Sequence, residues 1–349
     1  MNRTIIAGIG CYLPEKVVTN EDLTQLMDTN DQWIQERTGI QERRYAKRFE
    51  ETTATMGAEA AKIAMERAGV GPEDIDFLIF ATLSPDYYFP GCGVLVQRML
   101  GLKDIGALDV RNQCSGFVYG LSIADQFIKT GVYKNILLIG SETHSYALDF
   151  NTRSRHVSVI FGDGAGAVVL QPTQDENRGI LSSHLHSDGS DAEVLCMPNP
   201  GFHVGVHNKN WKPSVPANPY GSLFVNQELL DKEDFYPYMD GQAVFKKAVV
   251  KLEEVVVEAL NAHHFSSTDL NLLVPHQANL RISQYLQKKL RLRDDQMFNN
   301  IQKYGNTTAA SVPIALCEAW ETGKVQTGDL VCLAVFGSGF TWGSTLLRW

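Results

Sequence analysis

Residues 106–140 read GALDVRNQCSGFVYGLSIADQFIKTGVYKNILLIG, and they decide the fold because two apolar runs flank a stretch of helical period. Within the stretch 115–130 the apolar positions recur at intervals of four, three and four: Phe117, Leu121, Ala124 and Ile128. The flanking runs 106–110 and 135–140 are short and apolar, as buried strands are. The segment therefore predicts strand, helix and strand in a helix-covered sheet.

The same alternation continues along the chain and predicts an α/β fold. Short apolar runs rich in β-branched residues are expected as strands at 4–8, 77–82, 165–170, 272–274, 330–335 and 344–347. Stretches of helical period are expected as helices at 53–68, 93–100, 241–262, 279–290 and 308–321.

Two pairs of segments echo each other across the chain, which predicts two related halves. The echoing pairs are 76–82 with 271–277 and 135–141 with 330–338. We expect one half in residues 1–175 and the other in residues 176–349. Segment 199–238 breaks the pattern, because it is dense in proline, asparagine and aromatic residues and has little periodicity. It is predicted to be an excursion or lid beside the second half.

Composition narrows the classes of function. The 349 residues include 40 Asp plus Glu and 31 Lys plus Arg, and the formal net charge of −9 argues against nucleic acid as a partner. No run approaches the roughly 20 apolar residues that cross a bilayer, and no signal peptide is recognisable, so we expect a soluble cytoplasmic protein without membrane contact. The six cysteines form no Cys-x-x-Cys pair and are expected to be reduced thiols.

Three polar residues at the ends of predicted elements are candidates for chemistry. Cys114 precedes the 115–130 helix, whose unpaired N–H groups and dipole are expected to lower the pKa of the thiol. His276 follows an apolar run, and Asn306 follows a glycine in a turn. Taken singly, each has a plain structural alternative: a buried cysteine, a core or loop histidine, and a turn residue.

Several unrelated motifs match one family in the same order along the chain. They are NDQWI (30–34) with RTGI (37–40), FGDGAGA (161–167), PHQANLR (275–281), GNT (305–307) and FTWG (340–343). With these motifs the chain resembles the 3-oxoacyl-[acyl-carrier-protein] synthase III family, the condensing enzymes that initiate fatty acid synthesis. The resemblance implies a thiolase-like fold, in which two duplicated halves form five layers in the order α-β-α-β-α.

The resemblance implies a catalytic triad of Cys114, His276 and Asn306. Cys114 would accept the acyl group of an acyl-CoA as a thioester. Malonyl-acyl carrier protein would then lose carbon dioxide, and His276 and Asn306 would donate hydrogen bonds to the developing enolate. The backbone N–H groups of Cys114 and Ser338 would hold the tetrahedral oxyanion. The family has glycine where this chain has Ser338, so this serine must adopt the torsions of the turn.

The resemblance also implies two binding surfaces. The adenine of CoA is expected to lie between Trp33 and Arg155. Arg37 and Asn279 are expected to contact the rest of the CoA molecule. The residues expected to dock the acyl carrier protein are Lys246, Arg281 and Lys288. For each of these three cations a solvated helix face is the plain alternative.

Phe89 matches a family phenylalanine that crosses the interface of a homodimer and closes the acyl pocket, which indicates a short primer. The long segment 199–238 indicates a remodelled acyl tunnel for another acyl group instead, and these two indications about the primer stay opposed.

No cofactor is expected, because the CoA thioester is a substrate and the glycine-rich motifs lack a dinucleotide fingerprint. No metal is expected either, since His184 and His186 have no further ligands close in sequence.

Two other functions stay open at this point. In the first, the acyl group passes from Cys114 to an alcohol, amine or other acceptor without decarboxylation, and His276 acts as a general base. In the second, the chain is a non-catalytic subunit that binds acyl carriers. The presence of all three candidate residues disfavours the second.

Overall fold

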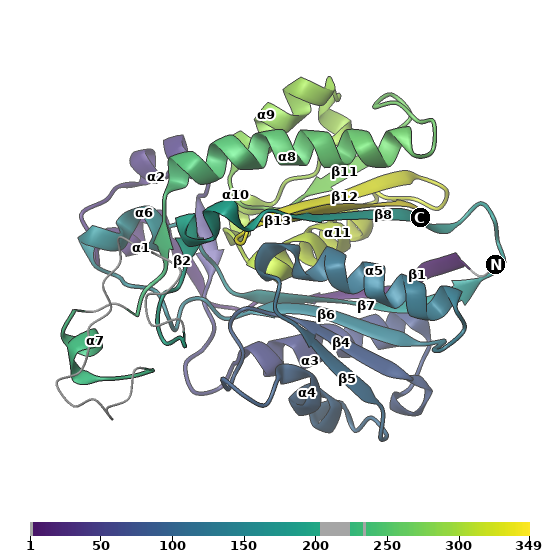
Figure 1. The fold of residues 1–349 in the computed structure, drawn as a ribbon, viewed down its shortest axis with the longest axis horizontal. Helices are drawn as coiled ribbons and strands as arrows, with labels where there is room; N and C mark the ends of the chain where they lie inside the picture. Colours follow the sequence, from purple (N-terminus) through teal and green to yellow (C-terminus); the bar gives the residue numbers. More distant parts are fainter. Residues whose placement is uncertain (1–2, 203–223, 233–234) are drawn as a thin grey trace.

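The computed structural model describes residues 3–202, 224–232 and 235–349, which form alternating layers of helix and sheet (Figure 1). Two central helices lie between two sheets, and further helices cover the outer face of each sheet. The α/β fold with five layers that the sequence predicts is therefore confirmed. Within the described ranges, we find no helix with the length and apolar character of a membrane span.

The first sheet has five strands in the order β1-β7-β6-β4-β5. They are β1 (Arg3–Tyr12), β7 (Gly164–Thr173), β6 (Ile136–Glu142), β4 (Phe77–Ala81) and β5 (Gly106–Val110). The pairs β5–β4 and β4–β6 are parallel, whereas β6–β7 and β7–β1 are antiparallel. Every residue of β6 is buried, because helices cover both faces of the sheet.

The second sheet has the order β11-β12-β13-β8 and repeats part of the first. Its strands are β11 (Leu272–Pro275), β12 (Leu330–Gly337), β13 (Thr341–Arg348) and β8 (Gly179–Ser187). The directions of its pairs reproduce those of β4-β6-β7-β1, so the sequence echoes mark equivalent strands. The chain crosses from the first sheet to the second between Thr173 and Gly179, where the sequence predicts the division into halves.

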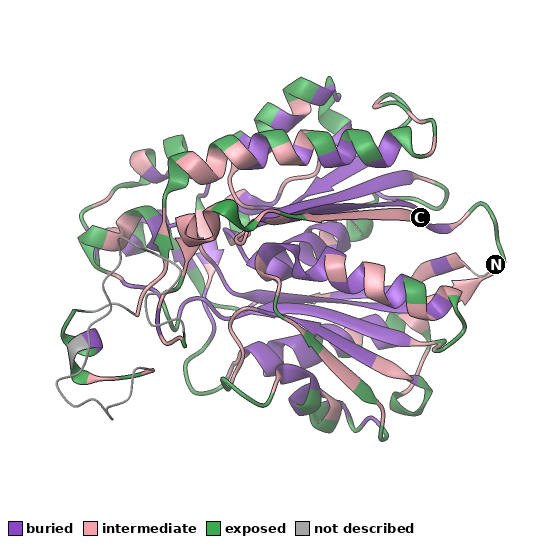
Figure 2. Ribbon diagram, in the orientation of Figure 1, coloured by how far each residue is buried: buried purple, intermediate pink, exposed green. Residues whose placement is uncertain are grey.

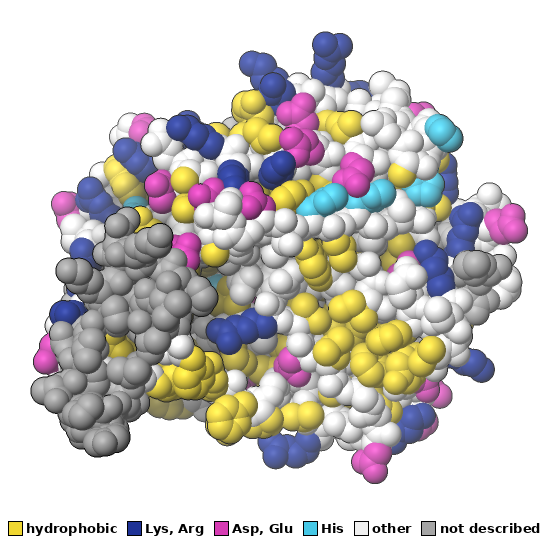
Figure 3. Space-filling model, viewed as in Figure 1, with side chains coloured by type: hydrophobic (Ala, Val, Ile, Leu, Met, Phe, Trp, Pro, Cys, Tyr) yellow, Lys and Arg dark blue, Asp and Glu magenta, His cyan; other side chains and the backbone are white. Residues whose placement is uncertain are grey.

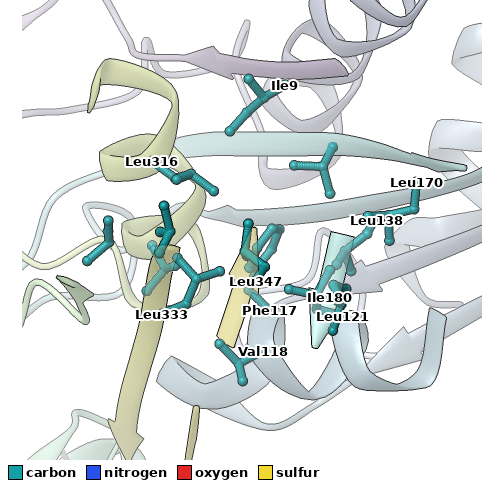
Figure 4. Close-up of a cluster of buried hydrophobic side chains, with 14 of the residues drawn as sticks. Ile9, Phe117, Val118, Leu121, Leu138, Leu170, Ile180, Leu316, Leu333 and Leu347 are labelled. Carbon is teal, nitrogen blue, oxygen red and sulfur yellow. The ribbon is translucent and has the colours of Figure 1, made fainter. Parts of the chain in front are cut away.

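The central layer consists of α5 (Gly116–Lys129) and α11 (Ser311–Glu321). The outer helices are α3 (Thr53–Ala68) and α4 (Cys92–Leu100) on the first sheet, and α8 (Gly241–Asn261) and α9 (Leu280–Leu290) on the second. One buried cluster joins both central helices to both sheets, with Leu121 and Leu316 packed among strand residues such as Leu138 and Leu333 (Figure 4). Buried residues are accordingly concentrated in the sheets and the central helices (Figure 2).

The sequence patterns did not predict the shorter elements, and of the edge strand β8 they indicate only a possible strand around His184 and His186. The short helices and strands are β2 (Val17–Thr19), α1 (Asn20–Thr24), α2 (Asp31–Thr38), β3 (Glu42–Arg44), α6 (Arg155–Ser158), β9 (Leu195–Cys196), α7 (Gln227–Asp231), β10 (Tyr238–Met239) and α10 (Ile301–Tyr304). Single 3-10 turns lie at η1 (Pro72–Asp74), η2 (Gln113–Ser115), η3 (Thr152–Ser154), η5 (Asp294–Gln296) and η6 (Thr308–Ala310), and a longer 3-10 segment at η4 (Gly189–Val194). Apart from β8 and α2, these elements are too short for a hydrophobic period to be visible.

The predicted excursion 199–238 is only partly covered, because residues 203–223 and 233–234 lie outside the described residues. Its two ends are held together by the antiparallel pair β9–β10, in which Cys196 lies opposite Tyr238. This pair marks the neck from which the segment leaves the second half.

Close packing of α11 on β7 depends on Gly166. A Cβ atom at this position would lie 2.6 Å from Pro313 Cβ and 2.9 Å from the backbone nitrogen of Ile314, so Gly166→Ala forces the helix away from the sheet. We expect this variant to lower the free energy of unfolding by about 2–3 kcal/mol, measured by urea denaturation. Gly189→Ala is the control, since a Cβ there meets nothing within 4 Å, and equal stability of the two variants would contradict the packing argument.

Candidate active site

Loops from both halves enclose a cavity of about 450 Å³. It is lined by Cys114 after β5, by His276 and Ser338 after β11 and β12, and by Asn306 ahead of α11. The two halves share one site because the central layer joins both sheets in a single buried core. The structure thus brings together the three side chains that the resemblance implies as a triad.

Cys114 lies in a tight turn that enters α5. The preceding Gln113 has a φ of +44°, which is unusual for a residue with a side chain, so the turn that presents the sulfur is strained. The end of β12 packs directly on this turn: a Cβ atom on Gly337 would lie 3.0 Å from Cys114 Cβ. Ser115 Oγ also donates to Thr341 O at 2.9 Å. Contacts from the second half therefore hold the turn in place.

The thiol of Cys114 is protonated in the free protein. Burial raises its pKa to about 12, and the nearby charge of Glu142 acts in the same direction. The backbone N–H groups of Cys114 and Ser338 bond the sulfur and lower the pKa, but they do not compensate for lost hydration. The lowered pKa expected at a helix start is therefore wrong. A thiol in this state would need a base to act as a nucleophile.

His276 is held with one ring nitrogen bonded and the other free. Its backbone N–H donates to Ala334 O at 2.8 Å, which extends the β11–β12 pairing by one residue. Nδ1 lies 2.6 Å from Ser311 Oγ, whereas the buried Nε2 has no partner among the described residues. Burial lowers the pKa of His276 to about 3, so the imidazole is neutral at physiological pH. A neutral imidazole can either accept a proton or donate a hydrogen bond.

Asn306 is fixed by its backbone and by its amide oxygen. Its N–H donates to Ile160 O at 2.9 Å, and its C=O accepts from the N–H of Gly162 at 3.1 Å. The N–H of Thr308 donates to Asn306 Oδ1 at 2.9 Å. With Oδ1 occupied as an acceptor, the amide NH₂ is the group that Asn306 offers to a ligand in the cavity.

The turn at Ser338 accommodates a serine without backbone strain. Ser338 is not one of the described non-glycine residues that have a positive φ. The positive φ of this turn, +127°, falls on Gly339 instead. The N–H groups of Cys114 and Ser338 both approach the sulfur, so they lie where the carbonyl oxygen of a bound thioester would need donors.

Sequence reasoning missed four residues that support the triad: Ser311, Thr308, His144 and Glu142. Thr308 has a φ of +41°, rare for a β-branched residue, and its Oγ1 lies 2.9 Å from the Nε2 atom of the buried, neutral His144. The hydroxyl-rich run that follows Asn306, TTAAS, was the available sign of Thr308 and Ser311. Nothing in the local pattern singled out His144 or Glu142.

Glu142 is a fully buried carboxyl group at the end of β6. It accepts hydrogen bonds from Ser84 Oγ at 2.6 Å and from Thr82 Oγ1 at 3.0 Å. These donors favour the charged form, but burial outweighs them and raises the pKa of Glu142 to about 7. The group therefore changes its charge near neutral pH inside the wall of the site.

The ionisation of Glu142 should make the protein less stable as the pH rises. Because its pKa is raised from 4.5 to about 7 on folding, its stabilising effect is complete below pH 4.5 and is lost as the pH rises through 7, by up to about 3 kcal/mol. We expect Glu142→Gln to remove this loss, measured by chemical denaturation across the range. The exposed Glu66→Gln is the control, and coincident profiles for wild type and Glu142→Gln would contradict the assignment.

The four residues expected to bind CoA form one cluster beside the cavity. The guanidinium carbons of Arg37 and Arg155 lie 4.4 Å and 5.1 Å from the centroid of the Trp33 ring. Asn279 lines the cavity, and its Nδ2 donates to Arg37 O at 2.8 Å. An adenine stacked between Trp33 and Arg155 needs a separation of about 7 Å, two contact distances, so Arg155 must move outward to admit it.

Much of the cavity wall is apolar and includes the neck of the excursion. Leu195 and Cys196 of β9 and Met239 of β10 line it, together with Met197 and Pro237. Side chains of α8, among them Phe245 and Leu252, line it as well. The segment that the sequence marks as an excursion thus begins and ends at the cavity.

Phe89 and the three predicted docking cations all lie on the surface. Phe89 is 82% exposed and is not part of the cavity of its own chain. Lys246 on α8 and the α9 residues Arg281 and Lys288 are exposed, and within the described ranges no carboxylate forms a salt bridge with them. Helices α8 and α9 pack side by side in one outer layer, so the three cations belong to the same layer of the molecule (Figure 1).

Comparison with known proteins gives consistent matches along the chain. The family model described as 3-oxoacyl-[acyl-carrier-protein (ACP)] synthase III matches residues 108–189, and that for its C terminal part matches residues 260–349. Beta-ketoacyl-[acyl-carrier-protein] synthase III of Rhodospirillum centenum is 45% identical over 350 residues, 99% of each chain. The protein of that name from Caldanaerobacter subterraneus is 42% identical over 344 residues, 99% of this chain and 97% of the other. The crystal structure of 3-oxoacyl-[acyl-carrier-protein] synthase III from Aquifex aeolicus matches with a TM-score of 0.86 and 42% identity, covering 100% of both chains.

Proposed function

Because the chain belongs to the 3-oxoacyl-[acyl-carrier-protein] synthase III family, we propose that it condenses the acyl group of an acyl-CoA with malonyl-acyl carrier protein. The products are a 3-oxoacyl-acyl carrier protein, carbon dioxide and CoA, which places the reaction in fatty acid biosynthesis. The observation that carries the proposal is one cavity holding the Cys114 thiol, the neutral His276 imidazole with its free Nε2, and the Asn306 amide.

The first half-reaction loads the acyl group. His276 Nε2 takes the thiol proton of Cys114 as the sulfur attacks the thioester carbonyl. The oxyanion lies against the N–H groups of Cys114 and Ser338 until the bond to the CoA sulfur breaks. CoA leaves as a thiol with the proton from His276. The hydroxyl of Ser311 can either accept a hydrogen bond from Nδ1–H or donate one to a bare Nδ1. Its bond to His276 is therefore kept both when Nδ1 carries the ring proton and when Nε2 carries it.

The second half-reaction forms the carbon–carbon bond. The malonyl carboxylate leaves as carbon dioxide, and its electron pair forms an enolate that accepts hydrogen bonds from His276 Nε2–H and the Asn306 NH₂ group. The carbanion attacks the acyl carbonyl, the bond to Cys114 breaks, and the thiolate takes up one proton from solvent. Each step is assigned to a side chain or a backbone group, so this scheme uses no metal and no cofactor.

Acylation of Cys114 is the direct test. Incubation with acyl-CoAs of increasing length should add one acyl group to the intact mass of the protein, and Cys114→Ala should abolish the adduct. Cys196→Ser is a matched control because Cys196 lines the same cavity, and it should retain the adduct. No adduct with any acyl-CoA would overturn the proposal. An adduct that persists without carbon dioxide release from malonyl-acyl carrier protein would favour transfer to another acceptor.

We assign CoA binding to the Trp33 cluster. The indole and two guanidinium groups offer stacking surface and positive charge for an adenine and its phosphates. Asn279 connects this cluster to the cavity, since it contacts both. The acyl chain would then lie along the apolar wall formed by α8 and the neck of the excursion.

We assign docking of the acidic carrier protein to Lys246, Arg281 and Lys288. Arg281→Glu should raise the KM for malonyl-acyl carrier protein by about tenfold, because it removes one attraction and adds a repulsion, while kinetics with free malonyl-CoA should change little. The control is Lys62→Glu on α3, in the opposite outer layer (Figure 1). Equal effects of the two substitutions, or an equal loss with malonyl-CoA, would contradict this docking face.

The exposed edge of the first sheet supports a homodimer. β5 pairs only with β4 among the described strands, so its other edge is open to a second copy. The aromatic loop beside it exposes Tyr87, Tyr88 and Phe89, and Figure 3 shows apolar side chains gathered on one face of the molecule. In such a dimer Phe89 would close the acyl pocket of the partner subunit.

A further inference from the structure

Two cysteines lie together far from the proposed active-site cysteine in sequence and on different elements. Cys11 is half-buried on β1, and Cys317 is fully buried on α11. Their Sγ atoms and a carboxylate oxygen of Glu321 all lie within 4.8 Å of one another. The approach follows from the packing at Gly166, which lies opposite Cys11 in the β1–β7 pair and admits α11 close to the sheet.

A guanidinium group is already bound at this thiol pair. Arg67 Nη1 donates to Cys317 Sγ at 3.5 Å and to Ile9 O at 2.8 Å. Its Nη2 donates to Glu321 Oε1 at 2.6 Å, and the group lies 4.9 Å from the centroid of the Trp320 ring. The side chain of Arg67 is therefore held in place with its positive charge beside the Cys317 sulfur.

This arrangement favours thiol chemistry over metal binding. A metal ion would have to displace Arg67 from Glu321 and Cys317, since the guanidinium occupies the place of the cation. The positive charge of Arg67 favours the thiolate form of Cys317, which is the nucleophile when Cys317 attacks an oxidised neighbouring sulfur. The hydrogen bond with Cys11 and burial together raise the pKa of Cys317, so Cys317 keeps its proton at rest. Cys11 is the more accessible of the two and is the sulfur that reacts first.

We propose that Cys11 and Cys317 form a reversible disulfide when the protein meets a peroxide. The Cys11 thiolate attacks one oxygen of hydrogen peroxide; an S–O bond forms, the O–O bond breaks, and the leaving hydroxide takes a proton to become water. Cys317 then attacks the oxidised sulfur; the S–S bond forms, the S–O bond breaks, and the second hydroxide leaves as water with the Cys317 proton. Glu321, which accepts from Cys317 Sγ at 3.6 Å, is placed to carry that proton. A low-molecular-weight thiol reverses the reaction by exchange.

A peptide map prepared without reductant identifies the oxidised cysteines. The protein is treated with a small excess of hydrogen peroxide, denatured in N-ethylmaleimide and digested without reductant. We expect a cross-linked peptide that joins Cys11 to Cys317, with the mass of both peptides less two hydrogens, and its loss after dithiothreitol. In the same map Cys114 should carry the maleimide.

Two variants and a second probe keep the test decisive. Cys11→Ser should abolish the cross-link, whereas Cys332→Ser, which removes a buried cysteine from β12, should retain it. Phenylarsine oxide bridges neighbouring thiols, so the wild-type protein should bind one equivalent of it and Cys11→Ser should bind none. This measurement does not depend on whether the Cys317→Ser variant folds. Maleimide on both Cys11 and Cys317 after peroxide treatment, or oxidation at Cys114 ahead of them, would overturn the proposal.

Discussion

The burial of α5 and α11 between two sheets is the interaction on which the site depends. Each large apolar side chain that this layer buries contributes roughly 1.5–3 kcal/mol, and residues such as Phe117, Leu121, Val312 and Leu316 are buried almost completely. The strained turns at Gln113 and Thr308 each cost about 1–3 kcal/mol. These turns lead directly into the two central helices, so the burial of those helices offsets the strain and holds Cys114 and Asn306 in position.

The same burial sets the charge state of the site. Loss of hydration raises the pKa of Cys114 to about 12, lowers that of His276 to about 3 and raises that of Glu142 to about 7. The resting cavity therefore holds a neutral thiol and a neutral imidazole rather than an ion pair. In the proposed reaction, charge develops there only in the transition states, and the free Nε2 of His276 and the backbone N–H groups of Cys114 and Ser338 are the groups that would stabilise it.

The larger elements could be predicted because their signal is periodic and local. All six longer helices and eight of the strands fall where alternating apolar patterns predict them, and the repeated segments predict the two halves. The helix α2 lacks such a pattern, because it is mostly exposed and is defined by the Asn30 cap and the terminal Gly39. The predicted direction of the Cys114 pKa shift was wrong for another reason. The position of a helix N-terminus can be recognised in the sequence, whereas the burial that raises the pKa results from contacts between Cys114 and the second half of the chain.

The two halves explain why neither could hold the site alone. One constant shift in residue number relates the strands β4 and β6 to β11 and β12, and it also relates the strained Gln113 to the strained Thr308. By this shift Ala309 takes the place of Cys114, and Gly337 takes the place of Glu142. The contacts are reciprocal, since Glu142 accepts from the N–H of Ala309 at 3.4 Å while Gly337 packs against Cys114.

At the positions equivalent to Cys114 and His276, the other half carries a small residue that makes room for the reactive group. The small Ala309 leaves space at the turn where the first half has Cys114, the proposed nucleophile. Ala81, the equivalent of His276, is buried and apolar where the second half has its imidazole. Two copies of the first half would place two thiols in one cavity without the imidazole, and two copies of the second half would place two imidazoles there without the thiol. The chemistry therefore requires that the duplicated strand ends have diverged, and the fold lets them do so without disturbing the shared core.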